Sequence, residues 1–349
     1  MGAKRSLALA SRLRAGAYAG LRGLKPILRA APVDWLVRPY YGGIGSVLMF
    51  HSIVERAPKS PIECDFEVFK RIVEHVPKLG YQCVSLDQLA GGEFDPRRRV
   101  MVFTFDDGYR NNADLAWPYL HERSIPFTIY VTTGFLRRCA LPWWLLSDWF
   151  HDDGVTESDL RRSFAWTDEA SFAEVAAKAY TVGGRESVER IEEAARRDFG
   201  ELIQKRFEAE FLDDRQVSSL AGDSLVTIGN HSHTHPVFKG LSEVEIDAEF
   251  ETCNAILRGL TDRAVKHFSF PYGSRSQVGS REVGLAEAHG FATIATTRTA
   301  NLFPKSDTRR SYVLPRIAVN STTSLRDLEL KLSGLVPMVM NLGRRVPTD

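Results

Sequence analysis

The 349-residue sequence is poor in cysteine and contains no CxxC pair. Neither a zinc-thiolate knuckle nor a disulfide framework is expected, because the cysteines follow no regular spacing. Reduced, partly buried thiols favour the cytoplasm. The chain also lacks an internal repeat, and its short basic turn PRRR (96–99) does not indicate nucleic-acid binding. The four cysteines are Cys64, Cys83, Cys139 and Cys253.

Acidic residues are absent from residues 1–33, which carry seven lysines and arginines. Leucines alternate with these cations as in an amphipathic helix, and the arginines interrupt any apolar run long enough for a signal peptide or membrane span. Two interpretations stay open: a helix lying on an anionic membrane surface, or a solvated helix packed on its own domain. Gly16, Gly20 and Gly23 weaken both. We expect a cytoplasmic protein, with peripheral contact to the inner face of the membrane as the first interpretation.

The remaining chain has the composition of a soluble globular protein, with 44% hydrophobic and 26% charged residues overall. From Ser46 onward, short apolar strands alternate with amphipathic helices, which indicates parallel strands in a barrel or a doubly wound sheet. The predicted strands are 46–53, 81–86, 98–105, 126–134, 225–232, 265–270 and 291–297. The predicted helices are 65–80, 111–124, 241–260 and one ending at 290.

The strand pattern stops between residues 135 and 222. This stretch contains LPWWLLSDWF and then long, charged, alanine-rich segments, which predict a helical insertion between two strands. It follows the C-terminal end of a strand, where α/β enzymes build their sites, so a lid or substrate platform is plausible. Trp143, Trp144 and Trp149 could stack on sugar rings, although packing in the core of the insertion is the stronger expectation for at least one of them.

The sequence TFDDG (104–108) places two adjacent carboxylates directly after an apolar strand. Neighbouring like charges cost free energy unless a cation or a shared proton relieves them. Gly108 permits a sharp turn, and successive side chains on an extended segment point apart. Asp106 and Asp107 could therefore have different roles, one binding a metal while the other handles a proton.

A second polar cluster, NHSHTHP, follows a later strand and contains His231, His233 and His235. His231 and His235 can converge, and two imidazoles with one carboxylate make a three-ligand zinc site with an open position for water. Such a ligand set also suits Co²⁺ or Ni²⁺. His233 is expected to face away. Taken alone, the cluster could instead be a surface histidine run.

Together, TFDDG, HSHTH and FSFPYG resemble the motifs of the polysaccharide deacetylase family, with its NodB homology domain, from about Ser46 to Asn320. This resemblance to carbohydrate esterases implies an α/β fold, a distorted (β/α)7 barrel that binds a divalent metal. It also implies an enzyme that hydrolyses the N-acetyl groups of amino sugars. It implies Asp106 as the catalytic base and Asp107, His231 and His235 as metal ligands. It also implies that the Tyr272 backbone N–H stabilises the oxyanion, although Pro271 and Tyr272 could form only a tight turn.

The sequence departs from the best-known members of this family. Ser269 stands where they carry an arginine, and their Asp-Trp and Leu-x-His elements are not found, so the usual general-acid histidine is missing. His51, at the end of the first strand, and Arg316, in LPRIAVN, are the candidate substitutes. Both resemble a subgroup that includes poly-N-acetylglucosamine deacetylases. The alternatives are a packed strand-end histidine and an ordinary surface arginine.

The expected organisation is a basic arm (1–43), a barrel in two parts (44–134 and 223–335) separated by the insertion (135–222), and a tail (336–349). The expected function is metal-dependent removal of N-acetyl groups from an amino-sugar polysaccharide or a glycan precursor. A metal-dependent amidase acting on a non-sugar amide and a glycan-binding protein with a degraded site are the alternatives, since fold does not fix function. The oligomeric state is left open.

Overall fold

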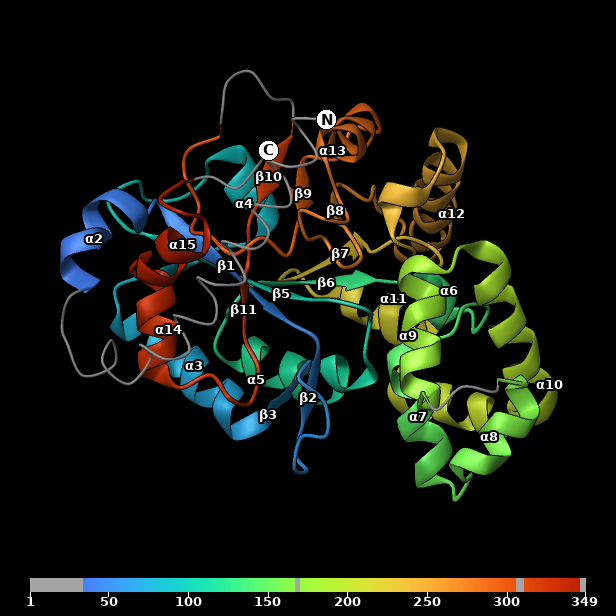
Figure 1. The fold of residues 1–349 in the computed structure, drawn as a ribbon. Coiled ribbons are helices and arrows are strands. Elements are labelled where there is room, and N and C mark those ends of the chain that lie inside the picture. Colours follow the sequence, from blue (N-terminus) through green and yellow to red (C-terminus); the bar gives the residue numbers. More distant parts are fainter. Residues whose placement is uncertain (1–33, 167–169, 306–310, 346–349) are drawn as a thin grey trace.

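The computed structural model describes residues 34–166, 170–305 and 311–345. Most of the predicted basic arm, residues 1–33, lies outside the described residues. Figure 1 shows strands at the centre of the molecule with helices around them, and a further group of helices on the right. Among the described helices, none has both the length and the apolar character needed to cross a bilayer.

The central sheet consists of parallel strands in the order β10-β9-β8-β7-β6-β5-β1-β11, with β4 paired to β5. Its strands are β1 (Gly45–Phe50), β4 (Gln82–Cys83), β5 (Val100–Phe105), β6 (Phe127–Val131), β7 (Val226–Asn230), β8 (His267–Ser269), β9 (Thr293–Ala295), β10 (Tyr312–Leu314) and β11 (Ile317–Ala318). A separate pair, β2 (Ser52–Val54) and β3 (Glu63–Asp65), lies beyond the end of β1.

The two edges of this sheet are consecutive pieces of one segment. β10 pairs with β9 and β11 pairs with β1, and only Pro315 and Arg316 separate them. Proline lacks the N–H that a ladder requires, so the strand breaks there and its two halves join opposite edges. Counted as one broken strand, β10 and β11 bring the path to seven strands. The predicted distorted (β/α)7 barrel is confirmed.

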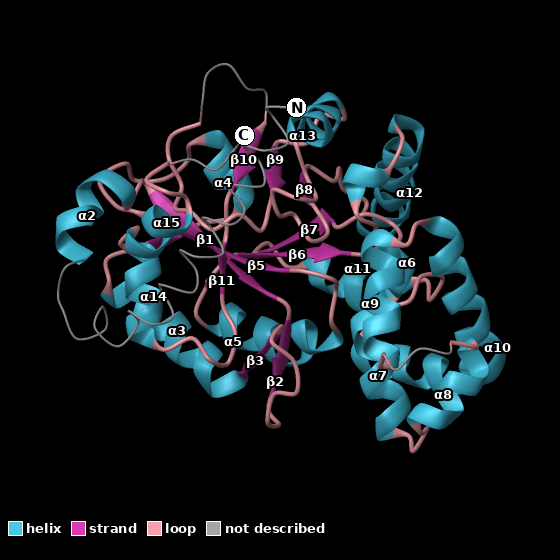
Figure 2. Cartoon of the chain, in the orientation of Figure 1, coloured by secondary structure: helices cyan, strands magenta, loops and turns pink. Residues whose placement is uncertain are grey.

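Helices cover the outside of the sheet (Figure 2). Side chains cap two of these helices: Asp65 accepts hydrogen bonds from the backbone of α3, and Ser242 and Glu245 form a capping box at α12. The helices around the barrel are α2 (Asp34–Tyr41), α3 (Phe66–Lys78), α4 (Leu86–Gly91), the π-helical turn η1 (Asn112–Ala116), α5 (Trp117–Glu122), α6 (Thr133–Leu136), η2 (Phe238–Gly240), α12 (Glu243–Thr261), α13 (Ser280–Ala288), α14 (Leu325–Leu332) and α15 (Leu335–Met340).

The strand predicted over 81–86 is too long. Only Gln82 and Cys83 pair with β5, because Ser85 forms a capping box with Gln88 and starts α4 at Leu86. The apolar run did not reveal this boundary, since an apolar residue suits the first turn of a helix as well as a strand.

The predicted helical insertion lies between β6 and β7. Its helices form the lobe at the right of Figures 1 and 2 and have an aromatic core that includes Phe150, Phe172 and Phe207. Trp149 belongs to this core and donates a hydrogen bond from Nε1 to Glu210 at 2.7 Å. The helices of this lobe are α7 (Trp143–Asp152), α8 (Glu157–Phe164), α9 (Phe172–Val182) and α10 (Arg185–Glu210), whereas α11 (Asp214–Gly222), which leads into β7, packs on the barrel core.

Alternation along the strands decides which side chains face the barrel interior. On β5, Val100 and Val102 belong to one core cluster, whereas Met101, Phe103 and Phe105 belong to the cluster that includes α3 and α5 residues. Because side chains alternate, Asp106 continues the row of Val100 and Val102. The strands thus direct Asp106 toward the mouth of the barrel.

We expect Phe103→Ala to lower the free energy of unfolding by about 3 to 5 kcal/mol, because it leaves a cavity where a buried ring stacks against Phe50. Urea denaturation followed by circular dichroism measures the loss. The half-buried Phe94 is the control, with an expected loss of about 1 kcal/mol on substitution by alanine. Equal losses at both positions would contradict the placement of Phe103 in the core.

Candidate active site

Side chains from the ends of several strands meet at one end of the barrel. Asp106 and Asp107 follow β5, His231 follows β7, and Ser269 ends β8. Since the strands are parallel, their C-terminal ends share one edge, so residues distant in sequence become neighbours. The sequence-predicted residues Asp107, His231 and His235 are brought together there as a potential metal-binding group.

The geometry of this group suits a single cation. Asp107 Oδ1 lies 3.3 Å from Nε2 of His231 and 3.3 Å from Nε2 of His235. The three candidate ligand atoms lie within 4.8 Å of one another. All three side chains are at most 8% exposed, so water offers them little compensation for the charge of the carboxylate.

The hydrogen bonds around His231 show that a cation fits. His231 Nδ1 lies 2.8 Å from the Ser269 carbonyl oxygen, which can only accept, so the Nδ1–H donates, and in the neutral imidazole Nε2 carries the lone pair. That lone pair faces a carboxylate oxygen. Among the described residues, Asp107 Oδ1 has no hydrogen-bond partner. Acceptors that converge without donors are stabilised by a divalent ion, and the donor set matches one.

The loop carrying the histidines is not helical. Ser232 and His235 have φ of 67° and 60°, and these left-handed residues turn both imidazoles toward Asp107. Asn230 Oδ1 accepts from the Ser232 N–H at 2.7 Å, and Glu249 accepts from the N–H groups of His233 and Thr234 at 2.7 and 2.8 Å. His233 faces away from the group, with Nδ1 2.9 Å from Thr133 Oγ1.

Asp107 does not continue the extended backbone of β5. Its φ of 71° and that of Gly108, 80°, swing its carboxylate back toward the histidines. The expectation that the two aspartates point apart is therefore wrong: His231 Nε2 lies 3.3 Å from Asp107 Oδ1 and 3.9 Å from Asp106 Oδ2. Left-handed conformations of non-glycine residues are costly and gather at functional sites, and Tyr272, with φ of 60°, adds another here.

Asp106 forms a buried ion pair with Arg316. Arg316 Nη1 and Nη2 lie 2.6 and 2.7 Å from the two carboxylate oxygens. Nη2 also donates to Ser269 Oγ at 2.9 Å, and Nε donates to the Thr296 carbonyl at 3.0 Å. Burial alone would raise the pKa of Asp106, but Arg316, His231 and His51 outweigh it and hold that pKa below its ordinary value. Arg316 lies at the break between β10 and β11, where the sheet closes, so its side chain lies inside the barrel.

His51 lies on the open side of Asp106. Its Nε2 is 4.0 Å from Asp106 Oδ2, and its side chain is 20% exposed. It is the residue after β1, and Asn112 Nδ2 donates to its carbonyl at 2.8 Å, which fixes this strand end. The histidine thus combines contact with the site and access to solvent.

The insertion covers the site with aromatic side chains. Trp143 Nε1 donates to the Tyr272 hydroxyl at 2.7 Å, and Trp144 Nε1 donates to the Tyr109 hydroxyl at 2.9 Å. The ring centroids of Trp144 and Tyr272 each lie 4.9 Å from that of His235. Burial raises the pKa of both tyrosines, so they remain neutral phenols. Helix α7 therefore supplies one wall of the site.

The comparison with protein families decides the identity. The family model for polysaccharide deacetylases matches residues 94–293, which include both aspartates and the histidines of the loop 231–235. The chain belongs to the polysaccharide deacetylase family. The resemblance expected from TFDDG, HSHTH and FSFPYG is confirmed. No curated protein matches this polysaccharide deacetylase.

Solved structures with the same fold cover most of the chain. The deacetylase PplD of Streptococcus pyogenes, in complex with acetate, is 14% identical with a TM-score of 0.55, covering 82% of this chain and 97% of PplD. IcaB from Ammonifex degensii is 17% identical with a TM-score of 0.54, and the match covers 82% of this chain and 96% of IcaB. A de-N-acetylase from Aggregatibacter actinomycetemcomitans is 13% identical with a TM-score of 0.54, and the match covers 82% of this chain and 98% of that de-N-acetylase. At these identities the likeness establishes the fold.

Sequence reasoning missed the residues that shape the site from outside. Glu249 lies within the predicted helix 241–260, and Asn230 lies within the predicted strand 225–232. Their side chains bond to backbone groups of the histidine loop, and a single sequence gives no indication of such pairs. The contact of Tyr109 with Trp144 joins the barrel to the insertion and was equally hidden.

We expect His231→Ala to abolish stoichiometric binding of a divalent metal, because it removes one of three ligands. The loss should exceed the roughly 10- to 100-fold that follows removal of a ligand's hydrogen-bond partner. Metal content after dialysis and titration calorimetry measure it. His233→Ala is the matched control and should keep the metal. Equal metal loss in both variants would show that the site lies elsewhere.

We expect Arg316→Met to destabilise the protein by about 3 to 5 kcal/mol, because it leaves Asp106 charged and buried without a partner. Arg137→Met, which breaks the exposed pair with Asp214, should cost less than about 1 kcal/mol. Denaturant unfolding compares the two variants. A small loss for Arg316→Met would contradict the buried ion pair.

Proposed function

We propose that this polysaccharide deacetylase is a metal-dependent hydrolase that removes N-acetyl groups from the amino sugars of a glycan. One observation carries the proposal: a buried set of one carboxylate and two imidazoles, Asp107, His231 and His235, lies beside the ion pair of Asp106 and Arg316. The family of the chain supports the substrate class.

Asp107, His231 and His235 would hold the ion. When bound, the ion acts as a Lewis acid that makes an amide carbonyl more electrophilic and water more acidic. Two imidazoles and a carboxylate leave an open coordination position, and we infer Zn²⁺ as the native ion, with Co²⁺ or Ni²⁺ as substitutes.

Asp106 is the proposed general base. As the oxygen of water attacks the acetyl carbon, Asp106 accepts a proton from that water. Arg316 is a positioning residue, because its bidentate contact fixes the carboxylate and keeps it ionised at neutral pH. The guanidinium thereby supplies the positive charge that other members of the family carry at the position of Ser269.

His51 is the proposed general acid. Cleavage of the C–N bond requires a proton on the leaving nitrogen, and His51 is close to Asp106 yet partly open to solvent. The products are acetate and the free amine of the sugar. The Tyr272 backbone N–H is the proposed donor to the oxyanion, and it makes no hydrogen bond to the described residues.

The partly exposed Trp143 and Trp144 support a sugar substrate. Both lie on the wall of the site formed by α7, and indole faces stack on the apolar faces of sugar rings. We propose the substrate as an N-acetylated amino-sugar polymer or its glycan precursor.

The direct test uses Asp106→Asn and N-acetylchitooligosaccharides. We expect metal content to be unchanged and kcat for acetate release to fall by about 10²- to 10⁴-fold, because the base is lost while all three ligands remain. Asp107→Asn is the paired control and should lose both metal and acetate release.

Two outcomes would overturn this proposal. Full activity of Asp106→Asn would remove the base assignment. Turnover of a simple N-acyl amide, with no acetate release from chitooligosaccharides or cell-wall glycan, would show an amidase for non-sugar substrates.

A further inference from the structure

The end of the barrel at which the parallel strands begin carries an unusual exposed apolar surface. In the described residues, six large hydrophobic side chains are classed as exposed, and four of them lie on α2 or just after α15. Trp35 is 66%, Leu36 54%, Tyr40 60% and Leu342 49% exposed. Single exposed apolar residues are ordinary, but a contiguous group that includes Trp and Tyr indicates an interaction surface.

Contacts join α2 to the C-terminal segment 341–345. The Tyr41 hydroxyl donates to the Gly343 carbonyl at 3.0 Å, and the Arg345 guanidinium lies 5.9 Å from the Tyr40 ring centroid. Gly334, at the start of α15, packs so closely on Tyr41 that an added Cβ would lie 2.3 Å from the Tyr41 carbonyl oxygen. These contacts join the part of α2 that carries Tyr40 to the segment that carries Leu342, and Trp35 and Leu36 lie on the same short helix.

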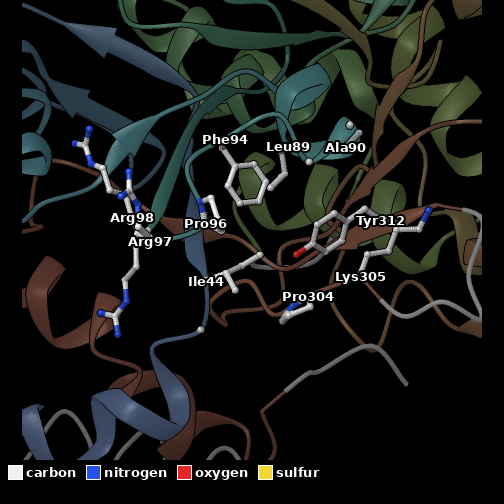
Figure 3. A pocket seen from close by; sticks show the side chains of 14 residues that line it. Ile44, Leu89, Ala90, Phe94, Pro96, Arg97, Arg98, Pro304, Lys305 and Tyr312 are labelled. Carbon is white, nitrogen blue, oxygen red and sulfur yellow. The ribbon is translucent and has the colours of Figure 1, made fainter.

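A basic hollow adjoins this surface. It encloses about 620 Å³ and is lined by Gly43 and Ile44, the residues that lead from α2 into β1 (Figure 3). Phe94 and Tyr312 form part of its apolar wall, and Figure 3 shows Arg97 and Arg98 on one side of it. We call α2, residues 341–345 and this hollow the basal face.

The charge of the basal face is predominantly positive. Asp95 pairs with Arg97 at 3.0 Å, and the only other acidic residues in these segments are Asp34 and Glu93. In sequence, residues 1–33 lead directly into α2 with seven basic and no acidic residues. The basic residues of the basal face are Arg38, Arg97, Arg98, Arg99, Lys305, Arg344 and Arg345.

We propose that the basal face is a docking surface for an anionic lipid bilayer. Trp and Tyr favour the interface between hydrocarbon and water, and arginines around them are attracted to anionic headgroups. An amphipathic helix binds more strongly where buried apolar area and such attraction combine. Charge complementarity thus favours a lipid surface over a second copy of this chain, whose basal face would carry the same charge.

The docked orientation follows from the barrel. α2 leads into the N-terminal end of β1, whereas Asp107 and His231 follow the C-terminal ends of β5 and β7. In Figure 1, α2 lies at the left and the helical insertion at the right. The candidate active site would therefore open away from the bilayer, into the aqueous phase.

The test is co-sedimentation of the full chain with vesicles of phosphatidylcholine alone or mixed with phosphatidylglycerol. We expect binding to the anionic vesicles only, weakened by added salt. The variant W35A/L36A/Y40A should bind at least roughly tenfold more weakly, because it lacks the apolar contact. V182A/V244A is the matched control, since these side chains are even more exposed but lie on other helices, and it should bind as the wild type does.

A charge variant tests the second half of the proposal. Arg97 and Arg185 are both more than three quarters exposed and each pairs with a nearby carboxylate. R97Q should weaken vesicle binding about fivefold, while R185Q should not change it. The thermal midpoint of every variant should stay that of the wild type, which excludes unfolding as a cause.

Three results would overturn the proposal: no binding to anionic vesicles, equal binding of W35A/L36A/Y40A and V182A/V244A, or binding to an oligonucleotide in place of vesicles. None of these readouts depends on acetate release, so the docking surface and the deacetylase proposal stand or fall separately.

Discussion

The site depends on the balance of charge at the mouth of the barrel. Asp106 and Asp107 are both buried, and one guanidinium, that of Arg316, is the counter-charge, bonded to Asp106. With neutral imidazoles this leaves one net negative charge, at the point where the lone pairs of two histidines and one carboxylate converge. Such an arrangement is costly in a low-dielectric interior unless a cation occupies it. A divalent ion held there would remove the cost and would also supply the Lewis acid of the proposed hydrolysis.

The closing strand of the barrel makes this balance of charge possible. Pro315 interrupts the last strand, so its halves join opposite edges of the sheet and Arg316, between them, reaches the interior. Within the sheet, β6 alone separates the strand ends that bear Asp107 and His231. A feature of topology, the closing strand, therefore sets the ionisation of the proposed base, while left-handed residues at Asp107 and His235 set the direction of the ligands.

Much of this could be predicted from sequence because the chemistry is concentrated in short motifs. TFDDG and HSHTH each follow an apolar strand, and parallel strands bring such ends together, so the ligand set and the barrel were foreseeable. The turn at Asp107 could not be predicted, since an extended backbone would direct neighbouring side chains apart. Glu249 and Asn230 bond to backbone groups of the histidine loop, and such contacts leave no pattern in one sequence. The basic residues 1–33 were visible as a membrane-binding candidate, but the exposed Trp35, Leu36 and Tyr40 required the fold.

Anomalous diffraction from crystals of the metal-loaded protein tests the central claim most directly. The account predicts one strong peak about 2.0 to 2.2 Å from Asp107 Oδ1, His231 Nε2 and His235 Nε2. A peak bound to other residues, or a fully loaded protein with no peak at this position, would contradict it.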